Sequence, residues 1–158
     1  QKKIQNLQFV FCGNGAGRAD LEVACENLNN IIFLDLQPFE RLGELLGLAD
    51  INLLPQRADA ADLVMPSKLT GMLASGKSVI ATATPDTELG YVITEDAKCG
   101  LIVTPEDGQE LAEAIIQLAG DPENRYTFGG NGRKYAEAKL DKNAVLRQCV
   151  QNLINLTK

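Results

Sequence analysis

The segment 64–82 constrains the fold more than any other part of the chain. Its pattern predicts a loop, a short helix, a tight turn and a strand. Leu69 and Met72 share one face of the expected helix, and Gly76 is placed to end it in a left-handed conformation. The strand 79–81 is too apolar for a sheet with one solvated face. It therefore predicts a parallel strand that is covered on both sides.

The start of this expected helix is a candidate anion-binding site. Pro66 is expected at or near the first helical position, where its missing N–H costs nothing, and Ser67 places a hydroxyl near the first turn. The first N–H groups of a helix lack intrahelical acceptors, and Lys68 adds a positive charge beside them. Because a lysine there opposes the helix dipole, it indicates a negative partner. The alternative is a solvated lysine on an ordinary crossover, and this segment alone leaves both interpretations open.

Short apolar strands alternate with helical segments along the chain. Strands are expected over 8–12, 31–34, 51–55, 79–81 and 101–103, and helices over 18–27, 38–49, 66–75, 87–95, 109–119, 123–139 and 143–156. The alternation predicts an α/β fold, a Rossmann-like, doubly wound parallel sheet of about five strands with helices on both faces. No repeat or inner boundary is evident, so residues 1–158 are expected to form one domain.

Composition excludes several classes of function. A net charge of −6 and a pI near 4.7 argue against nucleic acid as a partner. No apolar run approaches the roughly 20 residues that a membrane span needs, although peripheral membrane contact through another part stays open. The chain has no histidine, so it holds no imidazole base and no histidine metal site. Its four cysteines are scattered singly, which predicts reduced thiols in the cytoplasm.

Two further motifs lie where ligands often bind in α/β proteins. Gly13, Gly15 and Gly17 follow an expected strand and open a helix, as a phosphate loop does. Their GxGxG spacing is not the dinucleotide GxGxxG, however, so on its own it more often marks a tight turn. Asp86 and Glu88 follow an expected strand at its carboxyl end, where open sheets bind ligands. Acidic residues there could equally stabilise the start of a helix.

The order of these segments resembles a known family over nearly the whole chain. The matching segments are FVFCGNGAGRADL (9–21), FLDLQPFERLGELLGLADINLLP (33–55), LASGKSVIATATPDTELGYVI (73–93), GLIVTPEDGQELAEAI (100–115) and DPENRYTFGGNGRKYAE (121–137). They resemble the carboxy-terminal, donor-binding half of a family 4 glycosyltransferase of the GT-B fold. The Pro66–Ser67–Lys68 variant further resembles enzymes that build surface polysaccharides, including the colanic-acid type.

The resemblance implies a retaining enzyme that transfers a sugar from a nucleotide-sugar donor to a polysaccharide or lipid-linked acceptor. The expected donor-binding residues are Gly13, Gly15, Arg18, Asp62, Pro66, Ser67, Lys68, Leu69, Asp86, Thr87 and Glu88. In this picture the N–H groups of residues 67–69 cap the phosphates, and residues 86–88 face the sugar. The chemistry is positioning and charge neutralisation, with no metal or cofactor held by this domain and no catalytic residue assigned.

Two departures from the family pattern affect this interpretation. Gly71 and Leu63 stand where the family usually has glutamates, and only Asp62 or Asp59 could replace the first of them. The family's first strand–helix unit, with its Arg and Lys clamp, and its acceptor domain are expected before residue 1. We therefore expect a fragment that is inactive alone. A missing inner strand would expose strand edges, which predicts a homodimer formed through the edge near 9–12.

Two alternatives share features with this interpretation. A sugar-nucleotide 2-epimerase has the same fold, but it would use histidine near the diphosphate, and this chain has none. A non-catalytic nucleotide-binding or receiver-like module is the other alternative. A receiver would need an acidic cluster at one strand end and a lysine after the last strand, which the order of residues here does not provide.

Overall fold

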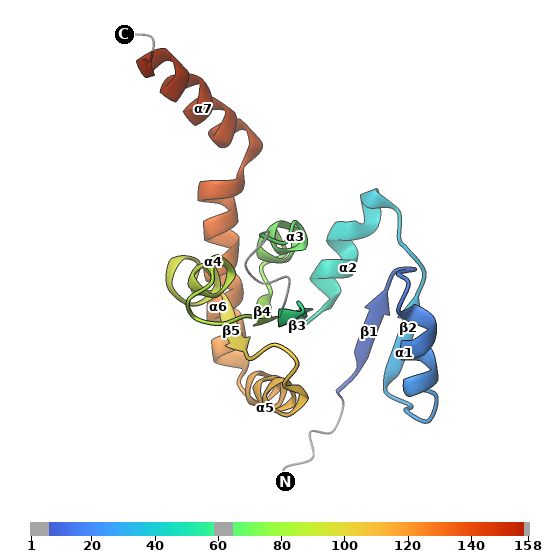
Figure 1. Ribbon diagram of the computed structural model, residues 1–158. Coiled ribbons are helices and arrows are strands. Elements are labelled where there is room, and N and C mark those ends of the chain that lie inside the picture. Colours follow the sequence, from blue (N-terminus) through green and yellow to red (C-terminus); the bar gives the residue numbers. More distant parts are fainter. Residues whose placement is uncertain (1–6, 59–64, 157–158) are drawn as a thin grey trace. The chain divides into compact units, whose positions relative to one another are not determined.

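The computed structural model describes residues 7–58 and 65–156 (Figure 1). The chain divides into two compact units, Gln1–Leu45 and Leu46–Lys158, a division that the sequence pattern does not indicate. Each unit carries a parallel sheet with helices beside it, which confirms the α/β class. Five strands are found in the described residues, but they form a two-stranded and a three-stranded sheet.

The first unit is built on two parallel strands. They are β1 (Phe9–Cys12) and β2 (Ile31–Leu34), joined through α1 (Arg18–Ala24). Side chains alternate between the two faces of a strand. Phe11 and Phe33 stack with their ring centroids 5.4 Å apart. Val10 and Ile32, at the alternate positions, remain 42% and 37% exposed. Thus one face of this small sheet is better covered than the other.

The second unit contains a three-stranded sheet with β4 (Ser78–Thr82) between β3 (Ile51–Leu54) and β5 (Gly100–Val103). All five residues of β4 are buried, which confirms the expectation of a doubly covered strand. The α2 helix (Leu42–Leu48) contains the boundary between the two units in the sequence. The later helices are α3 (Lys68–Ala74), α4 (Glu88–Tyr91), α5 (Gly108–Ala119), α6 (Pro122–Tyr135) and α7 (Lys142–Leu156). The α4 helix continues as a π-helical turn over Val92–Asp96, and α6 as another over Ala136–Leu140.

The core of the second unit lies around β4, where α3 and α6 meet. Leu73, Val79, Ile93 and Cys99 are at most 1% exposed in this core. The α6 helix is continuous, and Gly129 is the point at which it packs directly on backbone atoms of the turn after α3.

Two helical expectations were wrong in detail. The helix expected from Pro38 begins as a 3-10 turn, Phe39–Arg41, in which Phe39 is 84% exposed. The helix expected to reach residue 27 ends at Ala24, which is exposed rather than buried. The α7 helix forms as expected, but none of its residues is buried, and Leu153 is 58% exposed. Apolar periodicity identifies the face of a helix that prefers burial but does not supply the surface that covers it. Among the described residues, no helix has the length and hydropathy that crossing a membrane requires.

Candidate functional site

The glycine loop lies in the first unit, between β1 and α1. Gly13 has a φ of +131°, a backbone conformation that L side chains rarely adopt, so the turn itself requires glycine there. A Cβ on Gly15 would meet nothing within 4 Å. Crowding by other parts of the chain therefore does not explain why residue 15 is a glycine. The loop backbone near Gly15 is open to an approaching ligand.

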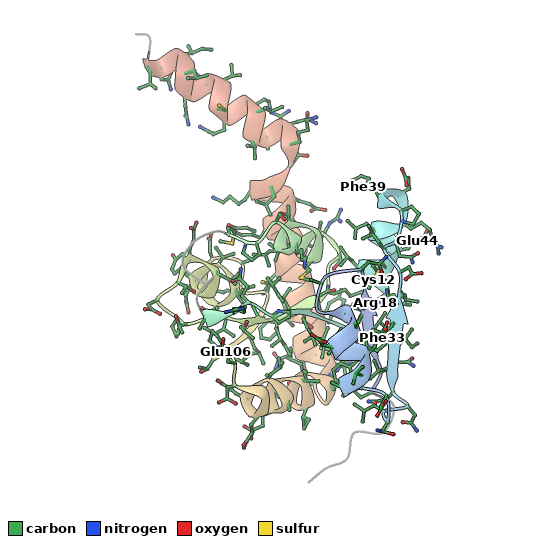
Figure 2. The ribbon with its side chains drawn as sticks, turned by 45° about the vertical axis from the view of Figure 1, so that its right-hand side comes forward. Cys12, Arg18, Phe33, Phe39, Glu44 and Glu106 are labelled. Carbon is green, nitrogen blue, oxygen red and sulfur yellow. The ribbon has the colours of Figure 1, made fainter. Side chains whose placement is uncertain are left out.

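Arg18, the first residue of α1, is surrounded by acceptors from its own unit. Its Nη1 lies within hydrogen-bond distance of the oxygens Gly13 O (3.0 Å), Asn14 Oδ1 (2.6 Å), Leu34 O (3.1 Å) and Asp35 Oδ1 (2.9 Å). Its Nε donates to Glu22 Oε1 at 2.7 Å, and its guanidinium carbon lies 6.0 Å from the centroid of the Phe33 ring (Figure 2). The hydrogen bond that Arg18 donates to Glu22, together with the negative charges of Glu22 and Asp35, raises the pKa of Arg18.

These contacts engage Arg18 within its own unit, and its expected role in donor binding stays a prediction. The resemblance implied a basic residue available to the donor, whereas the guanidinium is already bonded to groups of its own unit. A shallow, open hollow beside it is lined by Asn14, Gly15, Glu22 and Asp35 among others. Sequence reasoning missed Asn14, Glu22 and Asp35. Only Glu22 gave a readable signal, since it lies four residues after Arg18 on one helix.

In the second unit, the Pro66–Leu69 segment forms the start of α3. The helix begins at Lys68, and Pro66 precedes it as the first residue of a turn whose carbonyl accepts from Leu69 N at 3.0 Å. Ser67 makes no side-chain capping bond, and the first turn contains no acidic residue. Ser67 and Lys68 are both exposed. Nothing in the first turn of α3 therefore offsets the positive helix terminus and the lysine charge.

Leu69 fits the expected site less well than its neighbours. Its side chain is 3% exposed and belongs to the core, as the helical spacing predicted. Its N–H, expected to cap a phosphate, already donates to the carbonyl of Pro66. The candidate phosphate contacts on this segment are thus Ser67 and Lys68.

Residues 86–88 lie at the start of α4, after β4. Thr87 is the N-cap: its Oγ1 accepts from Gly90 N (3.0 Å) and donates to Thr84 O (2.7 Å), and the residue is 5% exposed. Asp86 and Glu88 are exposed. A hydrogen bond from Thr84 lowers the pKa of Asp86. Thr87 therefore performs the helix capping that was weighed for its two acidic neighbours, and its hydroxyl is engaged in that role.

Some expected site residues cannot be placed. Asp59, Asp62 and Leu63 lie outside the described residues. Gly71, where the family has a glutamate, is half-buried, and a Cβ there would lie 3.0 Å from Leu46 Cδ1. A glutamate at 71 would therefore require Leu46 to shift. Within the ranges 7–58 and 65–156, no three His, Cys, Asp or Glu side chains are grouped as a metal site would need.

Comparisons of the sequence and of the fold with known proteins both find glycosyltransferases. A family model described as "Glycosyl transferases group 1" matches residues 1–121. WcaI of Escherichia coli K12, described as a colanic acid biosynthesis glycosyl transferase, is 37% identical over 149 residues, which cover 93% of this chain and 36% of WcaI. Among solved structures, sucrose-phosphate synthase from Thermosynechococcus elongatus is 25% identical with a TM-score of 0.74, over 94% of this chain and 37% of that one. Anabaena HepE in complex with UDP-glucose is 20% identical with a TM-score of 0.75, over 94% of this chain and 41% of HepE.

Proposed function

The chain belongs to the group 1 glycosyl transferases, and we propose that it is the part of such an enzyme that binds the nucleotide-sugar donor. The observation that carries the proposal is the family match over residues 1–121. HepE, a structural neighbour, was solved with UDP-glucose, which supports a nucleotide diphosphate sugar as the donor class. The chain spans 36% of the length of WcaI, so the activity of a whole enzyme is part of the proposal.

The start of α3 is the proposed contact for the diphosphate. Ser67 and Lys68 lie at the positive end of the helix, and the Lys68 side chain is exposed. In the reaction, negative charge grows on the departing nucleotide diphosphate as its bond to the sugar breaks. The N–H groups at the helix start and the Lys68 ammonium would stabilise that charge without forming a covalent bond.

Further parts of the proposal concern the sugar and the acceptor. The exposed carboxylates Asp86 and Glu88 are the candidates to bind sugar hydroxyls in the second unit. We propose transfer with retention of anomeric configuration to a saccharide or lipid-linked acceptor. The likeness to WcaI, described as acting in colanic acid biosynthesis, supports the saccharide class of acceptor. We also propose that this domain holds no metal or cofactor and acts in the cytoplasm, where the full enzyme contacts a membrane only peripherally.

Nucleotide binding by the chain is the direct test. The 158-residue chain would be labelled with ¹⁵N and titrated with UDP, GDP and ADP, and then with UDP-glucose and GDP-mannose. We expect saturable amide shifts at Ser67 and Lys68 with one of the three bases. If no nucleotide shifts these amides, the proposed donor site is wrong.

Turnover by the complete enzyme separates transfer from the epimerase alternative. The product of the preferred nucleotide sugar would be followed by ¹H NMR at the anomeric proton. A new glycoside on an acceptor supports transfer, whereas an altered sugar still attached to the nucleotide supports epimerisation.

A further inference from the structure

The loop after β1 and the loop after β2 lie at the same edge of the two-stranded sheet, because the carboxyl ends of parallel strands meet there. Arg18 bonds to both loops. Its Nη1 reaches Gly13 O and Asn14 Oδ1 on one side, and Leu34 O and Asp35 Oδ1 on the other. One side chain thus links two loops that are separated in sequence by the whole of α1.

The guanidinium is itself held from two further directions. Glu22 accepts from Nε at 2.7 Å, and the ring of Phe33 lies beneath the guanidinium carbon at 6.0 Å. The Arg18 side chain is 25% exposed. The guanidinium contacts the two loops through Nη1 and Glu22 through Nε, so two nitrogens at a fixed separation are used, whereas a lysine ammonium offers one nitrogen.

The local charge argues against direct contact between Arg18 and a diphosphate. Its one positive charge is bonded to two carboxylates, those of Glu22 and Asp35. An anionic ligand would have to displace these carboxylates or lie beside them. The glycine loop next to Arg18, in contrast, exposes backbone at Gly15 with nothing crowding it.

We propose that Arg18 is a positioning residue for the nucleotide-sugar donor. It fixes the glycine loop to the end of β2, so that the backbone around Gly15 is held in one arrangement when the donor binds. Arg18 acts through this loop and does not itself bind the phosphates. The inference rests on the proposed function, since it requires that the loop meets a nucleotide sugar.

The proposal is tested by measuring how tightly Arg18→Gln and Arg18→Lys bind the preferred nucleotide diphosphate. The matched control is Arg41→Gln, which removes an arginine of the same unit that pairs with Glu44 at 3.1 Å on the surface. We expect both Arg18 variants to bind about tenfold more weakly and Arg41→Gln to bind as wild type does. Affinity in Arg18→Lys equal to wild type would overturn the proposal, because the charge alone would then suffice.

The salt dependence of binding distinguishes positioning from direct contact. A lost phosphate contact lowers the slope of affinity against salt concentration, whereas a displaced loop leaves the slope unchanged. We expect equal slopes for wild type and Arg18→Gln. A reduced slope in the variant would make Arg18 a direct ligand of the phosphates and overturn the proposal.

Hydrogen exchange separates this inference from the proposed function and from a general loss of folding. In Arg18→Gln we expect faster exchange at Asn14–Gly17 and at Asp35, with β1 still protected. Asp35→Asn keeps the shape of the side chain but removes the charge that pairs with Arg18. It should therefore show a smaller increase in exchange at the same amides. Faster exchange on one loop only, or throughout the unit, would overturn the proposal even if no nucleotide binds. Absence of binding in wild type would count against the proposed function instead.

Discussion

The carbonyl oxygen of Gly76 lies 2.1 Å from the point where Gly129 would carry a Cβ atom. Gly76 has a φ of +71° and forms the turn between α3 and β4, while Gly129 lies in the middle of α6. Arg133, one turn further along α6, donates from Nη1 to Ala74 O at 2.6 Å. The α6 helix is therefore anchored backbone to backbone on the turn that ends the candidate phosphate-binding helix.

Gly129→Ala is expected to destabilise the protein by about 1–3 kcal/mol, because its methyl group would overlap the Gly76 carbonyl. Gly130→Ala is the matched control, since a Cβ there meets nothing within 4 Å. In a helix interior that change should stabilise by about 0.5–1 kcal/mol. Urea unfolding of the three proteins measures both effects. Equal stability of the two variants would mean that α6 does not pack as described.

Lys68→Ala should weaken binding of the nucleotide diphosphate by about 1.5–3 kcal/mol, the range for a hydrogen bond to a charged group. Lys68 is exposed, so the free energy of unfolding should stay within about 0.5 kcal/mol of wild type. Calorimetric titration measures the affinity. Lys134→Ala removes an exposed lysine in α6 and serves as the control. An unchanged affinity in Lys68→Ala removes this residue from the site.

Thr87→Ala should cost about 0.5–2 kcal/mol of stability, because it removes the N-cap of α4. Thr87→Ser retains the hydroxyl and should keep most of that stability. Nucleotide-sugar affinity should be the same in both variants, since the wild-type hydroxyl is bonded to Thr84 and Gly90. A selective loss of affinity in folded Thr87→Ala that Thr87→Ser restores would show that the Thr87 hydroxyl contacts the sugar after all.

Cys99 should make stability fall at high pH. Burial raises the pKa of its thiol from 9.0 to about 12. Because the folded-state pKa is the higher one, its contribution is complete below pH 9 and is lost as the pH rises towards 12. The free energy of unfolding should therefore decline more steeply over this interval in wild type than in Cys99→Ala. Cys149→Ala, which removes an exposed thiol, should decline as wild type does.

Self-association is expected through β1. Among the described residues, β1 pairs with β2 only, and the N–H groups of Phe9 and Gly13 donate to that side. The N–H of Val10 therefore faces the open edge. Val10→Pro should abolish a concentration-dependent dimer seen by light scattering, while Val10→Thr should preserve it. A monomer at all concentrations, with slow amide exchange throughout 8–12, would contradict the prediction.

Local order along the chain could be predicted from the sequence. Strand 31–34 was predicted with its exact bounds, and the strand before the glycine loop to within one residue. The left-handed residue at Gly76 and the buried positions Leu69 and Met72 followed from helical spacing and turn chemistry. These features depend on neighbours within a few residues, so they can be predicted directly from the sequence.

The candidate site could be predicted only in part. The exposed Lys68 at a helix start is a local feature and was found. The bonding of Arg18 within its own unit was not found, because it depends on oxygens far away in the sequence, such as Leu34 O. The N-cap at Thr87 was missed although it is local, since Thr84 lies only three residues away. The residue type alone does not show whether an arginine or lysine is available to a ligand or is already bonded within the fold.

The sequence by itself determined the α/β class, the order of the elements and the family, because these follow from periodicity and motif order. Only the tertiary structure decided which apolar faces are covered, that α6 meets the Gly76 turn through Gly129, and that Arg18 links two loops. Those outcomes depend on close approach between distant segments. Side-chain packing and backbone hydrogen bonds set such distances to fractions of an ångström, and no local pattern encodes them.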